Sequence, residues 1–100
     1  MRVVSRRTLE EYWEGHADAE KPLLAWYAIA KRAAWSDFAE VRAQLPQTDL
    51  VVSDSGRKLV FNIRSNHYRL VCLVRFDRQA LYVLWIGTHA EYDRLDVKAL

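Results

Sequence analysis

The stretch KLVFNIRSNHYRLVCLVRFDRQALYVLWIGTHAEYDRLD, residues 58–96, decides the fold of this 100-residue chain. It contains three runs rich in β-branched and aromatic residues, and the polar segments SNH and DRQA separate these runs. Apolar and polar residues alternate within the runs, which indicates half-buried strands joined by turns. The stretch therefore predicts three antiparallel strands. The preceding DLVVSDSG, residues 49–56, is predicted to be a further strand or an extended loop.

The middle run has two chemically different faces. Because successive side chains of a strand point to opposite sides, Arg69 and Arg75 are expected on the face opposite Cys72. Residues 55–90 carry six basic side chains against one acidic one, although the net charge of the whole chain is only +2. A local basic field of this kind, rich in arginine, favours a polyanionic partner. From charge alone, a solvated strand face explains it equally well.

Residues 1–48 have helical periodicity instead. Apolar residues recur at helical spacing after Thr8, which has capping-box spacing with Glu11, and again after Asp18, a candidate cap for a second helix. A third, short helix is predicted after Ser36 or Asp37. Helices followed by a meander predict an α+β fold in residues 1–100, as one domain. The N-terminal helices should pack on one face of a mainly antiparallel sheet of three to four strands, with the other face partly open.

Composition narrows the class of protein further. Cys72 is the only cysteine and sits in an apolar run, which is typical of a small buried hydrophobe in a reducing compartment. The apolar runs are too short to cross a bilayer, and the N-terminus lacks the apolar core of a secretory signal. We therefore expect a cytoplasmic protein. Neither metal-ligand spacing nor a Gly-rich phosphate loop is present, so no metal and no cofactor are expected.

The segment after the last predicted strand carries candidate catalytic residues. Thr88 and Glu91 have capping-box spacing, so THAEYDRLD predicts a short helix with His89 at its first position. Unpaired amides at a helix start disfavour positive charge, which should help keep His89 neutral near pH 7. Tyr92 lies three residues later, on roughly the same face. Singly, a capping or surface histidine and a packing tyrosine would be the commoner explanations.

Two asparagines lie near the turn between the first two strands of the meander. Asn66 is in the turn itself. Asparagine tolerates the left-handed backbone of a tight turn, which would explain its presence there without a role in binding or catalysis. Asn62 lies inside a strand between two apolar residues, so its amide faces the open side of the sheet or needs a buried partner.

In two stretches the chain resembles the HigB-type toxins of bacterial type II toxin–antitoxin systems, within the RelE-like superfamily. The stretches are VFNIRSNHYRLV at residues 60–71 and IGTHAEYDRLD at residues 86–96, and AWYAIAKRAAWSDFAEV in the first half is also similar. The resemblance implies a RelE-like fold with a short C-terminal helix. It also implies a metal-independent endoribonuclease, an mRNA interferase that cleaves messenger RNA on the ribosome and so inhibits translation and growth.

The implied chemistry assigns roles to the candidate residues. In this reaction the 2′-hydroxyl of the RNA loses its proton and attacks the adjacent phosphate. The step needs a base, a cation for the developing negative charge and an acid that protonates the leaving 5′-oxygen. His89 would be the acid or the base, Arg69 would stabilise the phosphorane, and Tyr92 would orient the phosphate or stack a base. The expected substrate-binding residues are Asn62, Asn66, Arg64 and Arg75.

The resemblance also implies partners. These are a cognate antitoxin, expected to be a HigA-like helix-turn-helix protein, together with mRNA and the ribosome. The chain alone should be a monomer, and a higher-order complex should form with the antitoxin. Two alternatives stay open: a ParE-like gyrase inhibitor of the same fold, and an RNA-binding module without catalysis whose sheet stacks bases on Tyr68, Tyr82 or Trp85.

Overall fold

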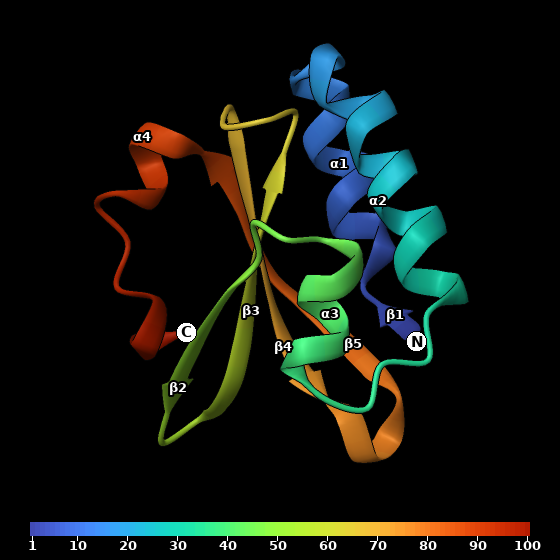
Figure 1. Ribbon diagram of the computed structural model, residues 1–100. Helices are drawn as coiled ribbons and strands as arrows, with labels where there is room; N and C mark the ends of the chain where they lie inside the picture. Colours follow the sequence, from blue (N-terminus) through green and yellow to red (C-terminus); the bar gives the residue numbers. More distant parts are fainter.

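The computed structural model describes residues 1–100 and is built around a sheet of five strands in the order β1-β5-β4-β3-β2 (Figure 1). The strands are β1 Arg2–Val4, β2 Asp49–Ser53, β3 Gly56–Ile63, β4 Tyr68–Arg75 and β5 Ala80–Thr88. The meander β3-β4-β5 confirms the three predicted antiparallel strands, and β2 forms an antiparallel fourth.

The prediction of three to four strands is wrong by one, because β1 pairs in parallel with β5. This strand is only three residues long and its partner lies far along the chain, so no local period marks it. Its start is held by contacts with the end of α2 (Glu20–Arg32). The Met1 ammonium group donates to the carbonyl oxygens of Ala30, Lys31 and Ala33, at the helix C-terminus, where carbonyl groups lack partners in a following turn.

The helices of the N-terminal half cover one face of the sheet (Figure 1). They are α1 Arg6–Gly15, the 3₁₀ turn η1 Ala17–Ala19, α2 Glu20–Arg32 and α3 Phe38–Gln44. Asp37 caps α3 by accepting a hydrogen bond from the Glu40 amide, as predicted. The α+β class and the RelE-like arrangement of helices on a mainly antiparallel sheet are therefore confirmed.

Two of the predicted helix starts are wrong. Helix α1 begins at Arg6, so Thr8 lies inside its first turn, and the residue before it, Ser5, has a left-handed backbone and makes no capping bond. Asp18 does not cap α2 either, because its carboxylate points to the sheet. It accepts hydrogen bonds from the hydroxyl of Tyr68 and from Arg64.

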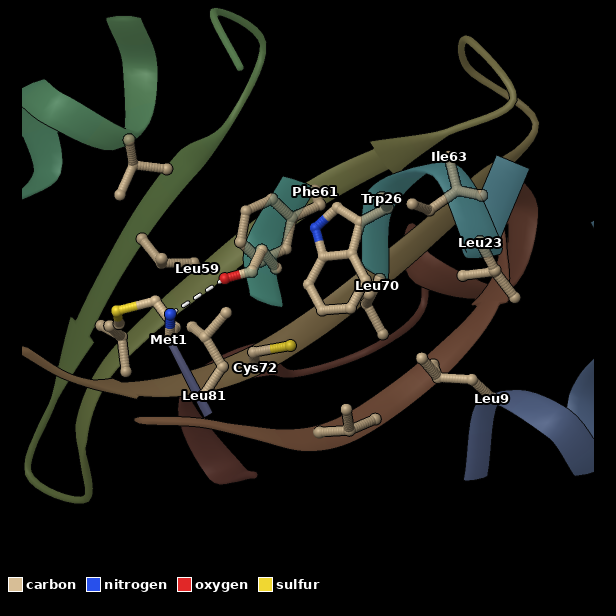
Figure 2. Packing of buried hydrophobic residues seen from close by; sticks show 14 of the residues in the cluster. Met1, Leu9, Leu23, Trp26, Leu59, Phe61, Ile63, Leu70, Cys72 and Leu81 are labelled. Atoms are coloured by element: carbon tan, nitrogen blue, oxygen red, sulfur yellow. Dashed lines mark hydrogen bonds between the residues drawn. The ribbon is translucent and has the colours of Figure 1, made fainter. Parts of the chain in front are cut away.

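The main core lies between these helices and the sheet (Figure 2). Its members include Leu9, Leu23, Trp26, Leu59, Phe61, Ile63, Leu70, Cys72 and Leu81. Cys72 is fully buried, as expected, and burial raises the pKa of its thiol. None of the helices is long and apolar enough to cross a membrane.

The opposite face of the sheet is less open than predicted. The C-terminal segment, with α4 His89–Tyr92 and the 3₁₀ turn η3 Val97–Ala99, folds back over it (Figure 1). Val97 is buried there against Val60 and Val71, in a second, smaller apolar cluster. Lys58, on the same face of β3, is also fully buried, and its ammonium group donates to the carbonyl oxygens of Val97 and Lys98 at 3.2 and 3.3 Å.

A β-bulge positions the last part of β5. The β4–β5 register pairs Val71 with Trp85 but Cys72 with Val83, which leaves Leu84 as an extra residue in β5. A bulge of this kind shifts the alternation of the residues after it. As a result, Trp85 lies on the face covered by α4, where it joins the second cluster.

Candidate active site

The start of α4 is fixed by the predicted capping box. The Thr88 hydroxyl accepts from the Glu91 amide at 3.1 Å, and the Glu91 carboxylate accepts from the Thr88 amide at 2.8 Å. The second of these bonds holds the pKa of the Glu91 carboxyl below its ordinary value. The amide of His89 in turn donates to the carbonyl oxygen of His67 at 2.9 Å. Helix α4 is thereby attached to the turn between β3 and β4.

His89 is half-buried, and its two ring nitrogens lie in different surroundings. Nε2 is 3.7 Å from the Asp93 carboxylate one turn later, which makes an ion pair when the imidazole is protonated. Nδ1 is buried and has no hydrogen-bond partner. A buried ring nitrogen without a partner is rare in folded proteins.

Arg69 lies beside the same helix. The β4–β5 register places it opposite Gly87, two residues before His89. Its guanidinium carbon is 5.7 Å from the centroid of the Tyr92 ring, within the range of a cation–π contact. One terminal nitrogen, Nη2, donates to the side-chain oxygen of Asn66 at 2.5 Å, whereas Nη1 is buried without a partner.

Asn66 therefore has a role that its position in a turn does not explain. The turn residues with a left-handed backbone are Arg64 and Ser65, not Asn66. The side chain of Asn66 instead holds the guanidinium of Arg69. The structure favours a positioning function for this residue over the purely conformational explanation.

Tyr92 and Asn62 complete the cluster around Arg69. Burial is the main cause that raises the pKa of Tyr92, with a further contribution from Asp49, so the phenol keeps its proton at neutral pH. Asn62 pairs with Arg69 across the β3–β4 ladder, and its amide donates to the side-chain oxygen of Gln47 at 3.0 Å. Its side chain is thus on the α4 face and not in the main core.

Two of the predicted substrate-binding residues lie outside this cluster. Arg64 turns toward η1 and forms a 2.8 Å ion pair with Asp18. Arg75 pairs with Asp77 at the far end of β4. Because a strand rises about 3.3 Å per residue, it lies about 20 Å from Arg69.

Gly87 also shapes the site, although it was not among the predicted site residues. A Cβ atom on Gly87 would lie 2.5 Å from two ring carbons of Trp85 and 3.0 Å from the Glu91 carboxylate. The Trp85 ring therefore lies on the bare backbone of Gly87 and reaches toward Tyr92, with 6.2 Å between their ring centroids. The sequence holds one signal of this contact: Trp85 and Gly87 are two positions apart in one strand, and such residues share a face.

A second group of side chains supports the hairpin turn from the helix side. Tyr12 stacks on His16 with 4.0 Å between ring centroids, and both rings meet Tyr68 edge-on. Burial, together with the charge of Glu91, raises the pKa of Tyr12 to about 12. The hydrogen bond from its hydroxyl to Asp18 is the main cause that raises the pKa of Tyr68. These tyrosines stay neutral and act as packing between α1 and the sheet end.

No group of three or more His, Cys, Asp or Glu side chains is arranged to hold a metal ion. The polar groups that converge at the site are an imidazole, a guanidinium, a phenol and two amides. Such a set can exchange a proton and stabilise negative charge, which is the requirement for phosphoryl transfer within RNA.

Comparison with known proteins agrees with the resemblance seen in the sequence. A family model described as HigB_toxin, RelE-like toxic component of a toxin-antitoxin system, matches residues 19–95. A protein of Escherichia coli O6:H1 named mRNA interferase HigB is 25% identical over 95 residues, which cover 95% of this chain and 91% of that protein. The mRNA interferase toxin HigB of Escherichia coli K12 is 25% identical over 93 residues, with coverages of 93% and 88%. A protein of Shigella flexneri, named mRNA interferase HigB, matches to the same extent.

Proposed function

Since the chain belongs to the HigB family of RelE-like toxins, we propose that it is an mRNA interferase, an endoribonuclease that uses the cluster around Arg69. Relatives named mRNA interferases match it over nearly its whole length. The observation that carries the proposal is that Arg69 contacts the ring of Tyr92, which lies three residues after His89 in the same helix.

Each residue has a part in the reaction. His89 removes the proton from the 2′-hydroxyl or delivers one to the leaving 5′-oxygen. As the 2′-oxygen bonds to phosphorus and the bond to the 5′-oxygen breaks, negative charge builds on the phosphoryl oxygens. Arg69 stabilises that charge with the guanidinium that Asn66 already orients.

Tyr92 and Asn62 act on the position of the RNA. The neutral phenol of Tyr92 can donate a hydrogen bond to the scissile phosphate, and its ring holds Arg69 in place. Asn62 faces the same side of the sheet one strand away and contacts the neighbouring nucleotide. Arg64 and Arg75 are still predicted to bind RNA, but farther from the cut. Both are exposed, near opposite ends of β4, where a longer RNA could reach them.

The partners follow from the same proposal. An antitoxin is implied by the family, and we infer that it is a HigA-like helix-turn-helix protein. We place the activity in the cytoplasm, where messenger RNA and ribosomes are found.

The test is induction of the chain in a bacterial host without its antitoxin, with total messenger integrity and growth measured together. The wild type should arrest growth and leave cleaved transcripts. His89→Ala and Arg69→Ala should lower the cleavage rate by about 100-fold or more, as losses of an acid–base group or an electrostatic donor do. Arg78→Ala is the matched control and should cleave like the wild type, because Arg78 is an exposed arginine in the 3₁₀ turn η2 (Phe76–Arg78).

Soluble protein is measured for each variant, so that misfolding is recognised. Growth arrest with intact transcripts would refute the endoribonuclease proposal and direct attention to DNA gyrase. Arg75→Ala, run in parallel, shows whether RNA reaches the far end of β4.

A further inference from the structure

A pocket of about 330 Å³ lies beside Asn62 at the edge of the sheet. The pairing of β2 with β3 begins at Asp49 and Val60, so β3 runs past the end of β2. The connection between α3 and β2 borders the pocket there, in place of a strand. Leu45 and Pro46 are apolar parts of its wall. Of the residues given a part in the reaction above, only Asn62 lines this pocket.

The floor of the pocket is aromatic. Trp26 and Phe61 pack edge to face, with 5.1 Å between ring centroids (Figure 2). Trp26 is 4% exposed, and its indole nitrogen has no hydrogen-bond partner. A buried donor without a partner is unfavourable by about 1 to 3 kcal/mol, and the side chain that carries it lines this pocket.

The rim of the pocket is polar and incompletely paired. The amide of Asn62 donates to Gln47, and no other protein group bonds to the side-chain oxygen of Asn62 or to the side-chain nitrogen of Gln47. One acceptor and one donor are therefore free side by side. The Ser65 side chain also lines the pocket. A flat ligand with an apolar face and an edge that both donates and accepts hydrogen bonds matches this arrangement.

Nucleobases have this chemistry, and the position of the pocket suits them. Asn62, at the rim of the pocket, lies directly across from Arg69, with a usual spacing of about 5 Å between the Cβ atoms of such a pair, whereas the aromatic floor belongs to the opposite face of the sheet. The pocket volume is at the lower end of the usual range for small-molecule sites. Proteins that recognise single-stranded RNA bind splayed bases with aromatic contacts and hydrogen bonds to the base edges.

We propose that this pocket binds one base of the RNA, next to the phosphate at Arg69, and so selects the sequence at which the chain cuts. The inference rests on the proposed endoribonuclease function. Gln47 and Asn62 contact the edge of the base, and Trp26, Phe61 and Pro46 surround its apolar part. Gln47 is then a specificity-determining residue that takes no part in the bond-breaking step.

The experiment maps the 5′ ends of cleaved transcripts in cells that express each variant. Gln47→Ala should cut RNA but lose preference at one position beside the cut by about three- to tenfold, the effect of one hydrogen bond. Gln47→Trp, which fills the mouth of the pocket, should reduce the preference further. Gln44→Ala is the matched control, because Gln44 lies in neighbouring α3 and bonds to Trp35 outside the pocket. It should keep the wild-type profile.

Binding provides a second measurement that does not need turnover. The His89→Ala protein is titrated with short single-stranded RNAs that differ at the selected base, with and without Gln47→Ala. Discrimination between these RNAs should fall by the same three- to tenfold factor.

Each other outcome overturns a different claim. If the wild type and Gln47→Ala cleave identical sites at identical relative rates, the pocket inference is wrong and the endoribonuclease proposal stands. If the wild type leaves transcripts intact, the proposed function fails first. If Gln47→Trp keeps the cleavage profile but escapes neutralisation by the antitoxin, the pocket is a protein-docking site and the inference is overturned.

Discussion

Lys58 should be among the most sensitive positions for stability, although it lies outside the active site. Its side chain is fully buried on the α4 face, and its ammonium group makes four hydrogen bonds with three N–H groups, so one N–H is shared between two acceptors. Two go to the hydroxyls of Ser53 and Ser55, and two to carbonyl oxygens of the C-terminal segment. Lys58→Met keeps most of the apolar stem and removes the charge with all four bonds.

Two effects oppose each other in this substitution. Replacing a buried charge by an apolar group can be neutral when its partners are replaced too. Here the acceptors remain, and the two carbonyl oxygens lose their charged donor. A hydrogen bond to a charged group contributes about 1.5 to 3 kcal/mol, and release of the segment would also expose part of Val97, which is 8% exposed at present. We therefore expect a loss of about 2 to 4 kcal/mol in the free energy of unfolding.

Chemical denaturation and thermal melting measure this loss. The variants are made in the His89→Ala background, which allows expression without growth arrest under the proposed function. A loss of 2 kcal/mol corresponds to a fall of at least about 8 °C in Tm for a domain of this size. Lys98→Met, an exposed lysine in the same segment, is the control and should stay within about 0.5 kcal/mol of its background. Unchanged or higher stability of Lys58→Met would refute the reasoning, since desolvation of the ammonium group would then outweigh its four bonds.

Three further predictions concern the site and its surroundings. Gly87→Ala should lower the free energy of unfolding by about 1 to 3 kcal/mol and also lower the cleavage rate, because the new methyl group displaces Trp85. Gly15→Ala is the control, since a Cβ atom there meets nothing within 4 Å. Equal effects of the two substitutions would contradict the contact between Gly87 and Trp85. The pKa of Asp18 lies below its ordinary value of 3.8, mainly because of the hydrogen bond from Tyr68 and also because of the charge of Arg64. The carboxylate therefore stabilises the folded state above pH 3.8 and loses this effect as the pH falls through its lowered pKa. Wild type should therefore be more stable than Asp18→Asn at pH 6, with the difference shrinking below pH 3.8 in denaturation curves, and a difference independent of pH would rule this out. Cleavage by purified protein should continue in a chelator, whereas loss in the chelator and recovery with magnesium would show a metal-dependent reaction.

Local sequence patterns predicted most of the secondary structure and part of the candidate site. The change from helical to alternating periodicity marks the boundary between helices and meander, because each period reflects which residues of one element face the core. The capping box of Thr88 and Glu91 was predictable because its two bonds span only three residues. Alternation likewise put Arg69 on the face opposite Cys72, where the structure has it.

Contacts between distant segments were not predictable in this way. Three such contacts join residues from separate elements: Arg69 with the ring of Tyr92, Tyr68 with the Asp18 carboxylate, and Asn62 with the side-chain oxygen of Gln47. Asp18 looked like a helix cap because capping propensity is local, and the bond to Tyr68 appears only when η1 and β4 have packed together.

The sequence by itself determined most of the helices and strands, the two faces of β4 and the residues with reactive side chains. Only the tertiary structure decided that β1 joins the sheet, that Lys58 is buried and that Arg75 lies far from Arg69. The physical reason is that periods and caps arise from neighbours a few residues apart, whereas register, burial and the convergence of a site depend on how whole elements pack. A one-residue shift between β4 and β5 would put Trp85 on the other face, and the bulge at Leu84 that prevents this is visible only once the strands are paired.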